Sequence, residues 1–171
     1  MPTKILSCNM HFISTEASTR ILTPSKGTLM RVEFHGLTFD LPAGWVDIAG
    51  DLPEGSPPTL AKETDGCGAI QFSIAKYRGG EKPNVDFNAL RTFMLQFCQN
   101  NSIDAGNITK NESESIISVG VLSDTDDQLL SAWYLSNGND VVFMTYLGMA
   151  NDTDCLKELD VARAIVSSIS F

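Results

Sequence analysis

The stretch that decides the fold runs from Leu129 to Leu147 and reads LLSAWYLSNGNDVVFMTYL. Two runs of strand length, Leu129–Leu135 and Val141–Leu147, flank the dipeptide Asn137-Gly138. Asparagine and glycine tolerate the positive φ angles of a two-residue hairpin turn, and Asn-Gly is the strongest short-range hairpin signal. We therefore predict that the two runs pair as antiparallel strands around a two-residue turn.

A third strand precedes this hairpin. Ile116–Leu122 has the length and apolar content of a strand. The acidic segment Ser123–Asp127 then forms the turn that leads into Leu129–Leu135. Together the three strands form an antiparallel meander.

A helix is predicted on each side of the meander. Apolar residues recur at spacings of three and four within Asp86–Asn100, and either Asn84 or Asp86 can cap this helix by accepting a bond from a free backbone N–H. A second helix is expected over Asp152–Ser167, with acidic residues at its positive end. The apolar stripes are Phe87, Leu90, Met94, Phe97 and Cys98 in the first helix, and Cys155, Leu159, Ala162, Val166 and Ile169 in the second.

Short strands are predicted before the first helix. Arg31–His35 and Leu37–Leu41 alternate between apolar and polar residues and are separated by one glycine. Trp45–Ile48 and Ala69–Ala75 are further strands. The proline-rich stretch Gly50–Pro58 between them is expected to be an exposed loop.

The order of these elements predicts the fold class and the domain limits. Helices separated by a meander, rather than alternating with single strands, favour an α+β fold with a mainly antiparallel sheet. Residues 1–29 show no sustained period and hold three basic residues against one acidic residue. We expect them to form a loosely ordered basic tail, and residues 30–171 to form a single domain.

The composition excludes several classes of protein. With 43% hydrophobic and 19% charged residues, the 171-residue chain is globular rather than disordered. The net charge of -9 repels phosphate backbones and anionic membranes, so nucleic acid is not an expected partner. No run reaches the roughly 18 apolar residues of a membrane span. The start of the chain lacks a signal peptide's apolar segment, and we expect a cytoplasmic protein.

The cysteines and histidines are the candidate reactive groups of the chain. Cys8, Cys67, Cys98 and Cys155 contain no C-x-x-C pair and are interpreted as small buried thiols. Cys67 lies between two glycines, so a reactive thiol is the alternative to an inert one at this position. His35 beside Gly36 is expected on the surface. We predict no catalytic residue.

No metal ion or cofactor is predicted. The acidic turn lacks the glycine and glutamate of a calcium-binding loop, because Leu129 and Leu135 stand at those positions. What remains is candidate recognition surface for a positively charged protein partner. The candidate partner-binding residues are Asp47, Asp51 and Glu54 in or near the proline-rich loop, and Asp124, Asp126 and Asp127 in the meander turn.

A family resemblance is carried by the segment Phe39–Trp45 and by the C-terminal end Ala164–Phe171. With the proline-rich loop, strand, helix and meander between them, the chain resembles the PsbP-like superfamily. That superfamily includes an extrinsic photosystem II protein, a Ran-binding transport factor and small bacterial DcrB-type proteins, some of them immunity proteins or secretion chaperones. The resemblance implies a three-layer α-β-α sandwich that binds another macromolecule, without shared catalytic residues.

Three functional hypotheses follow. The leading one is a non-enzymatic protein-binding domain, namely an immunity protein that neutralises a basic toxin. The first alternative is a secretion chaperone that holds an apolar segment of an effector. The second alternative is a small enzyme built around Cys67, His35 or both.

Overall fold

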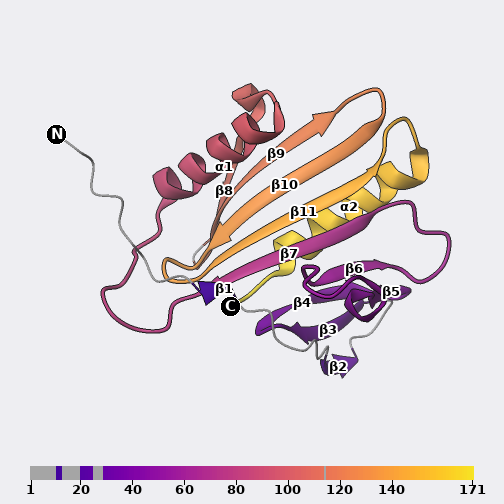
Figure 1. The fold of residues 1–171 in the computed structure, drawn as a ribbon. Helices are drawn as coiled ribbons and strands as arrows, with labels where there is room; N and C mark the ends of the chain where they lie inside the picture. The colour runs from indigo at the N-terminus through magenta and orange to yellow at the C-terminus, as the bar shows by residue number, and fades with distance from the viewer. Residues whose placement is uncertain (1–10, 13–19, 25–28, 114) are drawn as a thin grey trace.

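The computed structural model describes residues 11–12, 20–24, 29–113 and 115–171 (Figure 1). Thirteen regular elements are described in these ranges, with two 3-10 turns at Ala49–Asp51 and Ala105–Asn107. The strands and helices are β1 His11–Phe12, β2 Arg20–Pro24, β3 Leu29–Phe34, β4 Leu37–Pro42, β5 Trp45–Asp47, β6 Thr59–Lys62, β7 Ala69–Lys76, α1 Phe87–Asn101, β8 Thr109–Glu112, β9 Ile117–Asp124, β10 Gln128–Ser136, β11 Val141–Met149 and α2 Thr153–Ser168.

The central hairpin forms as predicted, but its turn is longer than predicted. Strands β10 and β11 pair antiparallel from Gln128↔Met149 to Ser136↔Val141, which leaves four loop residues rather than two. The Asn137 Oδ1 atom accepts hydrogen bonds from the backbone N–H groups of Asn139 (3.0 Å) and Asp140 (2.8 Å). Because the Asn137 side chain satisfies these two donors, the longer loop is stabilised and the two-residue turn was a wrong prediction.

All strand pairings of the described residues are antiparallel, and the strands form two sheets. In the larger one, sheet A, the order is β5-β6-β7-β11-β10-β9-β8, and β1 also pairs with β7. The smaller one, sheet B, has the order β2-β3-β4. Strand β7 therefore lies beside β11, although 64 residues, which include helix α1, separate the two strands in the chain.

The two helices cover opposite faces of sheet A, which gives the three layers of an α-β-α sandwich (Figure 1). Helix α1 packs with Val119, Val121 and Ala132 in one apolar cluster. Helix α2 packs with sheet B and the opposite face of sheet A in a larger cluster. The α+β fold class predicted from the sequence is confirmed.

Both predicted helices are present, and an aspartate caps each. Asp86 accepts a hydrogen bond from the Ala89 N–H, so Asp86 rather than Asn84 caps α1. Asp152 accepts hydrogen bonds from the N–H groups of Asp154 and Cys155 at the start of α2. In α1, three members of the predicted stripe are buried, and in α2 all the stripe positions inside the helix are buried together with Glu158.

Two short strands lie in the segment that the sequence analysis described as a loosely ordered tail. Strand β1 pairs with the end of β7, and β2 pairs with β3. The missing apolar period at residues 1–29 gave no sign of these pairings. The domain boundary at residue 30 stays a prediction.

The two tryptophans differ in their burial. Trp45 is 3% exposed and belongs to the cluster beneath α2. Trp133 is half-buried at the margin of the same cluster.

Candidate functional site

Three connections of the chain meet at one end of sheet A. The register pairs Ala69 with Leu147, Gln128 with Met149, and Leu129 with Asp124. The β6–β7, β9–β10 and β11–α2 connections therefore lie side by side, beyond neighbouring strands β7, β11, β10 and β9 (Figure 1). We call this region, made of residues 62–68, 122–128 and 147–157, the acid end.

The acid end has many carboxylates and few cations. Its two lysines are engaged in ion pairs, because Lys62 Nζ lies 3.7 Å from Glu158 Oε1 and Lys157 Nζ lies 2.7 Å from Asp154 Oδ1. The hydrogen bond from Lys157 lowers the pKa of Asp154, and the same bond raises the pKa of Lys157. The carboxylates of the acid end are Glu63, Asp65, Asp124, Asp126, Asp127, Asp152 and Asp154, all exposed except the half-buried Asp152.

Exposed apolar side chains accompany these charges. Leu147 (45% exposed) and Met149 (56%) lie at the end of β11, Leu122 (39%) lies near the end of β9, and Leu156 (45%) lies in the first turns of α2. Strand alternation puts Leu147 and Met149 on the face of sheet A that α1 packs against. The acid end thus holds exposed apolar side chains as well as exposed carboxylates, with Leu147 and Met149 together on one face.

The six predicted partner-binding residues fall into two separate groups. Asp124, Asp126 and Asp127 are exposed in the acid end. The second group is Asp47, the last residue of β5, with Asp51 and Glu54 in the β5–β6 connection, and it lies at the other end of β6 from the β6–β7 connection. Four strand spacings from β6 to β9 correspond to about 19 Å. The structure therefore does not bring the two groups together.

Within the second group, Asp47 has a structural role. The Asp47 carboxylate is half-buried, and its Oδ1 atom accepts a hydrogen bond from the Ala49 N–H at 2.9 Å. This bond holds the start of the loop. Asp51 and Glu54 are exposed.

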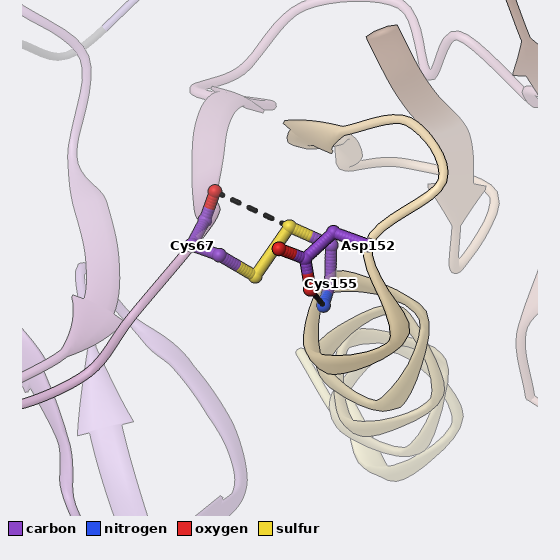
Figure 2. Close-up of side chains that lie close together, drawn as sticks. All are labelled: Cys67, Asp152 and Cys155. Carbon is purple, nitrogen blue, oxygen red and sulfur yellow. Dashed lines mark hydrogen bonds between the residues drawn. A yellow bond between two sulfur atoms is a disulfide. The ribbon is translucent and has the colours of Figure 1, made fainter.

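A disulfide lies beneath the acid end, joining Cys67 in the β6–β7 connection to Cys155 in the first turn of α2 (Figure 2). The two Cα atoms are 5.6 Å apart, and 88 residues separate the cysteines in the chain. The interpretation of these two residues as thiols was wrong, because a disulfide pairing between distant cysteines cannot be deduced from spacing alone. Cys98 is a buried free thiol, whereas Cys8 lies outside the described residues.

Close packing explains the glycines around the disulfide. A Cβ atom on Gly68 would lie 2.7 Å from the carbonyl oxygen of Leu147, and one on Gly148 would lie 3.1 Å from Cys155 Sγ. Real Cβ atoms do not approach backbone oxygens this closely. The Gly66-Cys67-Gly68 sequence therefore fits the chain against β11 and α2.

A buried carboxylate links the same segments. Glu158 is 1% exposed, and its oxygens accept hydrogen bonds from the N–H groups of Cys67 (3.3 Å) and Gly68 (3.1 Å) and from the Tyr146 hydroxyl (3.4 Å). Burial and the nearby Glu158 raise the pKa of Tyr146. Glu158 was not predicted, although its position within the helical stripe, between Cys155 and Leu159, was an available signal in the sequence.

His35 and Cys67 are far apart. His35 and Gly36 have φ angles of 51° and 78° in the turn between β3 and β4, and the Gly36 carbonyl accepts a hydrogen bond from Lys76 at the end of β7. Cys67 precedes the start of β7, and eight strand residues span about 23 Å. A nucleophile and its base must lie within hydrogen-bond reach. The structure therefore does not assemble a Cys67–His35 pair.

His35 is less exposed than expected. Its side chain is half-buried beside Phe34, with ring centroids 4.7 Å apart, and its Nε2 atom is buried with no hydrogen-bond partner among the described residues. Burial lowers the pKa of His35, and the nearby Asp47 carboxylate opposes this effect. The environment favours the neutral imidazole.

Comparison with known proteins identifies the fold. No protein-family model matches the chain, and no curated protein matches it. Among solved structures, PsbP (CyanoP) from Synechocystis sp. PCC 6803 matches with a TM-score of 0.50 and 16% identity, over 79% of this chain and 86% of that one. The fold is PsbP-like.

A second solved structure shares this PsbP-like arrangement. It is a protein from Bacteroides thetaiotaomicron VPI-5482, with a TM-score of 0.51 and 11% identity over 78% of this chain. The matched region spans 44% of the Bacteroides protein. At these identities the likeness concerns the fold alone, so the PsbP-like part of the resemblance noted from the sequence is confirmed at the level of architecture.

None of the helices among the described residues is long and apolar enough to span a membrane.

Proposed function

We propose that the chain is a non-enzymatic protein-binding domain whose acid end receives a positively charged partner. The observation that carries the proposal is that exposed carboxylates occur at the same end of sheet A as exposed apolar side chains, among them the neighbouring Leu147 and Met149 on one face. Exposed apolar side chains rimmed by polar groups are typical of protein interfaces. The carboxylates supply complementarity toward a basic surface.

The specific form of this proposal is an immunity protein that neutralises a basic toxin in the cytoplasm. The net charge of -9 supports it, because electrostatic steering accelerates association with a partner of opposite charge. In the reducing cytoplasm thiols are kept reduced, so the Cys67–Cys155 bridge would be open there. The acid end would then bind while both cysteines are thiols.

A secretion chaperone for an apolar effector segment is the second candidate. The observation that favours it is the exposure of Leu147 and Met149, two apolar side chains on one face at the end of β11. A chaperone of this kind depends on these two residues, whereas a receptor for a basic toxin depends on the neighbouring carboxylates. Variants of the two apolar residues and variants of the carboxylates therefore distinguish the chaperone function from the immunity function.

The test starts with capture of partners from the native cell by the tagged full chain, followed by measurement of association and dissociation rates with each purified partner. We expect the triple variant Asp124→Asn, Asp126→Asn, Asp127→Asn to slow association. We also expect added salt to slow association of the unaltered protein more than it speeds dissociation, since charges beyond roughly 8 Å are screened at physiological ionic strength.

The matched control is the double variant Asp51→Asn, Glu54→Gln, which removes exposed carboxylates away from the acid end. It should leave the association rate nearly unchanged. If salt and the triple variant both leave the rate unchanged while Leu147→Ser or Met149→Ser abolishes binding, the chaperone function replaces the immunity function. If neither set of variants alters binding, the acid end is not the recognition surface.

A further inference from the structure

Three side chains of types that bind metal ions meet beneath the acid end. Cys67 comes from the β6–β7 connection, whereas Asp152 and Cys155 come from the start of α2 (Figure 2). One ligand atom from each, namely two sulfurs and a carboxylate oxygen, lie within 4.8 Å of one another. Cys155 is buried, and the other two are half-buried. The group is therefore enclosed on one side and open to solvent on the other.

We propose that reduced Cys67 and Cys155, together with Asp152, form a binding site for a divalent cation of the Zn²⁺ class. Thiolates and carboxylates are both common Zn²⁺ ligands. Three protein ligands leave a fourth tetrahedral position for water or an exchangeable ligand. In the disulfide the sulfurs cannot act as thiolate ligands, so the redox state of the pair determines whether the site exists.

Conversion of the disulfide into the Zn²⁺-bound pair of thiolates takes two steps. A cellular dithiol reductant supplies two electrons and two protons, the Cys67–Cys155 bond breaks to give two thiols, and the reductant is oxidised to its own disulfide. Binding of Zn²⁺ then displaces the two thiol protons to solvent. The sulfurs separate to about 3.8 Å, the distance between two tetrahedral ligands at a Zn–S distance of roughly 2.3 Å.

The segments that carry the ligands are held together without the disulfide. Glu158 in α2 accepts the N–H groups of Cys67 and Gly68, so the β6–β7 connection stays attached to the helix when the sulfur bond breaks. Glycine packing against Tyr146 and Leu147 holds the same connection in place. Reduction therefore leaves the three ligands close together.

Hydrogen-bond donors of the backbone face two of the three ligand groups. Cys155 lies in the first turn of α2, where the helix dipole favours negative charge, and its Sγ atom lies 3.3 Å from the donor Met149 N–H. Asp152 Oδ1 already accepts the N–H groups of Asp154 and Cys155. A carboxylate has two oxygens, so the Asp152 side chain can cap the helix and bind a cation at the same time.

One contact at the site is redox-dependent as well. Cys155 Sγ lies 3.5 Å from the Cys67 carbonyl oxygen, the contact drawn as a dashed line in Figure 2. In the disulfide the sulfur has no hydrogen to donate, so this contact becomes a thiol hydrogen bond only after reduction. On Zn²⁺ binding the sulfur would give up this proton and act as a thiolate ligand.

The test uses the full chain in its oxidised form and after reduction with a phosphine, which is removed under anaerobic conditions. Co²⁺ and Cd²⁺ report thiolate ligation through charge-transfer absorption, and Zn²⁺ affinity is measured by competition with a chromophoric chelator. We expect one cation per reduced chain and none per oxidised chain. Equal binding by the two forms would overturn the proposal.

Variants identify the ligands. Asp152→Asn keeps a good helix cap but removes the anionic ligand, and it should weaken Zn²⁺ binding by about 10-fold or more. The matched control is Asp86→Asn, which makes the same change at the cap of α1 and should not alter binding. Cys67→Ser should abolish the charge-transfer band that indicates two thiolates. Equal affinities of Asp152→Asn and Asp86→Asn, or an unchanged band in Cys67→Ser, would contradict the proposed ligand set.

Discussion

Glu158 shows how one buried side chain can organise distant segments of this chain. Its side chain is 2% exposed and receives hydrogen bonds from the β6–β7 connection and from β11, with the Lys62 ammonium nearby. A buried carboxylate is tolerated only when hydrogen bonds and a countercharge compensate its lost hydration. The Cys67 and Gly68 N–H groups and the Lys62 ammonium are donors only, so an acceptor side chain is required opposite them.

The first prediction concerns this requirement. Glu158→Gln keeps the size of the side chain but turns an N–H₂ group toward other donors. We expect it to lower the free energy of unfolding by about 3 kcal/mol, as measured by urea denaturation. The matched control is Glu112→Gln, which breaks the exposed Lys110–Glu112 ion pair and should change stability by less than about 1 kcal/mol. Similar midpoints for the two variants would contradict a structural role for Glu158.

The second prediction concerns His35 and pH. Burial lowers the pKa of His35 in the folded protein, so the unfolded chain binds more protons than the folded protein at pH values just below the ordinary value of 6.5. The free energy of unfolding should therefore fall as the pH falls through that range.

The comparison for this effect is the variant His35→Asn, because an asparagine side chain does not titrate and tolerates the positive φ of this position. We expect the variant to lose less stability than the unaltered protein between about pH 7 and pH 5, in urea denaturation at each pH. Equal losses for the two proteins would show that His35 is not responsible.

At the scale of elements, the sequence patterns predicted strands where buried and more exposed positions alternate, and missed strands where they do not. Strand β4 alternates between buried and half-buried residues, and the alternation was visible in the sequence. Every residue of β8 is exposed, so no apolar period indicated this edge strand. Strand β6 was missed because two adjacent residues, Thr59 and Leu60, are both buried, which breaks the alternation.

The third prediction concerns the packing between β9 and β10. A Cβ atom on Gly120 would lie 2.8 Å from Trp133 Cδ1 and 3.3 Å from Thr109 Oγ1. Gly120→Ala should lower the free energy of unfolding by about 1–3 kcal/mol, because the indole must shift from its packed position. The control is Gly50→Ala, where no atom lies within 4 Å and where we expect a change within about 0.5 kcal/mol. Tryptophan fluorescence during urea denaturation measures both.

The fourth prediction concerns the bridge between the β6–β7 connection and α2. Closing a loop across 88 residues restricts the unfolded chain, and the loop-entropy relation gives about 4–5 kcal/mol of stabilisation. We therefore expect reduction, in the presence of a metal chelator, to lower the free energy of unfolding by about 4 kcal/mol. The measurement is urea denaturation with and without a dithiol.

A double variant separates this effect from other actions of the reductant. Cys67→Ser with Cys155→Ser should have the stability of the reduced protein and should not respond to a dithiol. An oxidised protein with the same midpoint as the reduced one would show that the bridge does not stabilise the fold.

At the scale of the whole molecule, the strand order determines which carboxylates gather. Strand β7 lies between β6 and β11, and not beside β8, the strand that follows it in the chain. This arrangement brings the β6–β7 connection next to the β11–α2 connection. Local periodicity predicts strands and helices but does not specify non-consecutive pairing. For this reason the sequence predicted Asp124, Asp126 and Asp127 as surface but not that they lie at the same end of sheet A as Asp65 and Asp152.

The last prediction concerns the extent of the folded unit. The two apolar clusters described above extend from Val32 to Ile169, and Arg31 ties β3 to the C-terminal segment through a 2.8 Å hydrogen bond to the Ser168 carbonyl. Strand β2 pairs only with β3 among the described strands, and β1 pairs only with β7. We therefore expect a chain that begins at Met30 to fold.

Removal of residues 1–29 leaves β3 as an edge strand, but Arg31 and Glu33 on that strand disfavour edge-to-edge association. The shortened chain should keep a single cooperative urea transition, and it should keep the far-ultraviolet circular dichroism of the α+β core. Gel filtration checks that it has the same oligomeric state as the full chain. Loss of cooperativity would show that the pairings of β1 and β2 are required for folding, and would move the domain boundary ahead of residue 20.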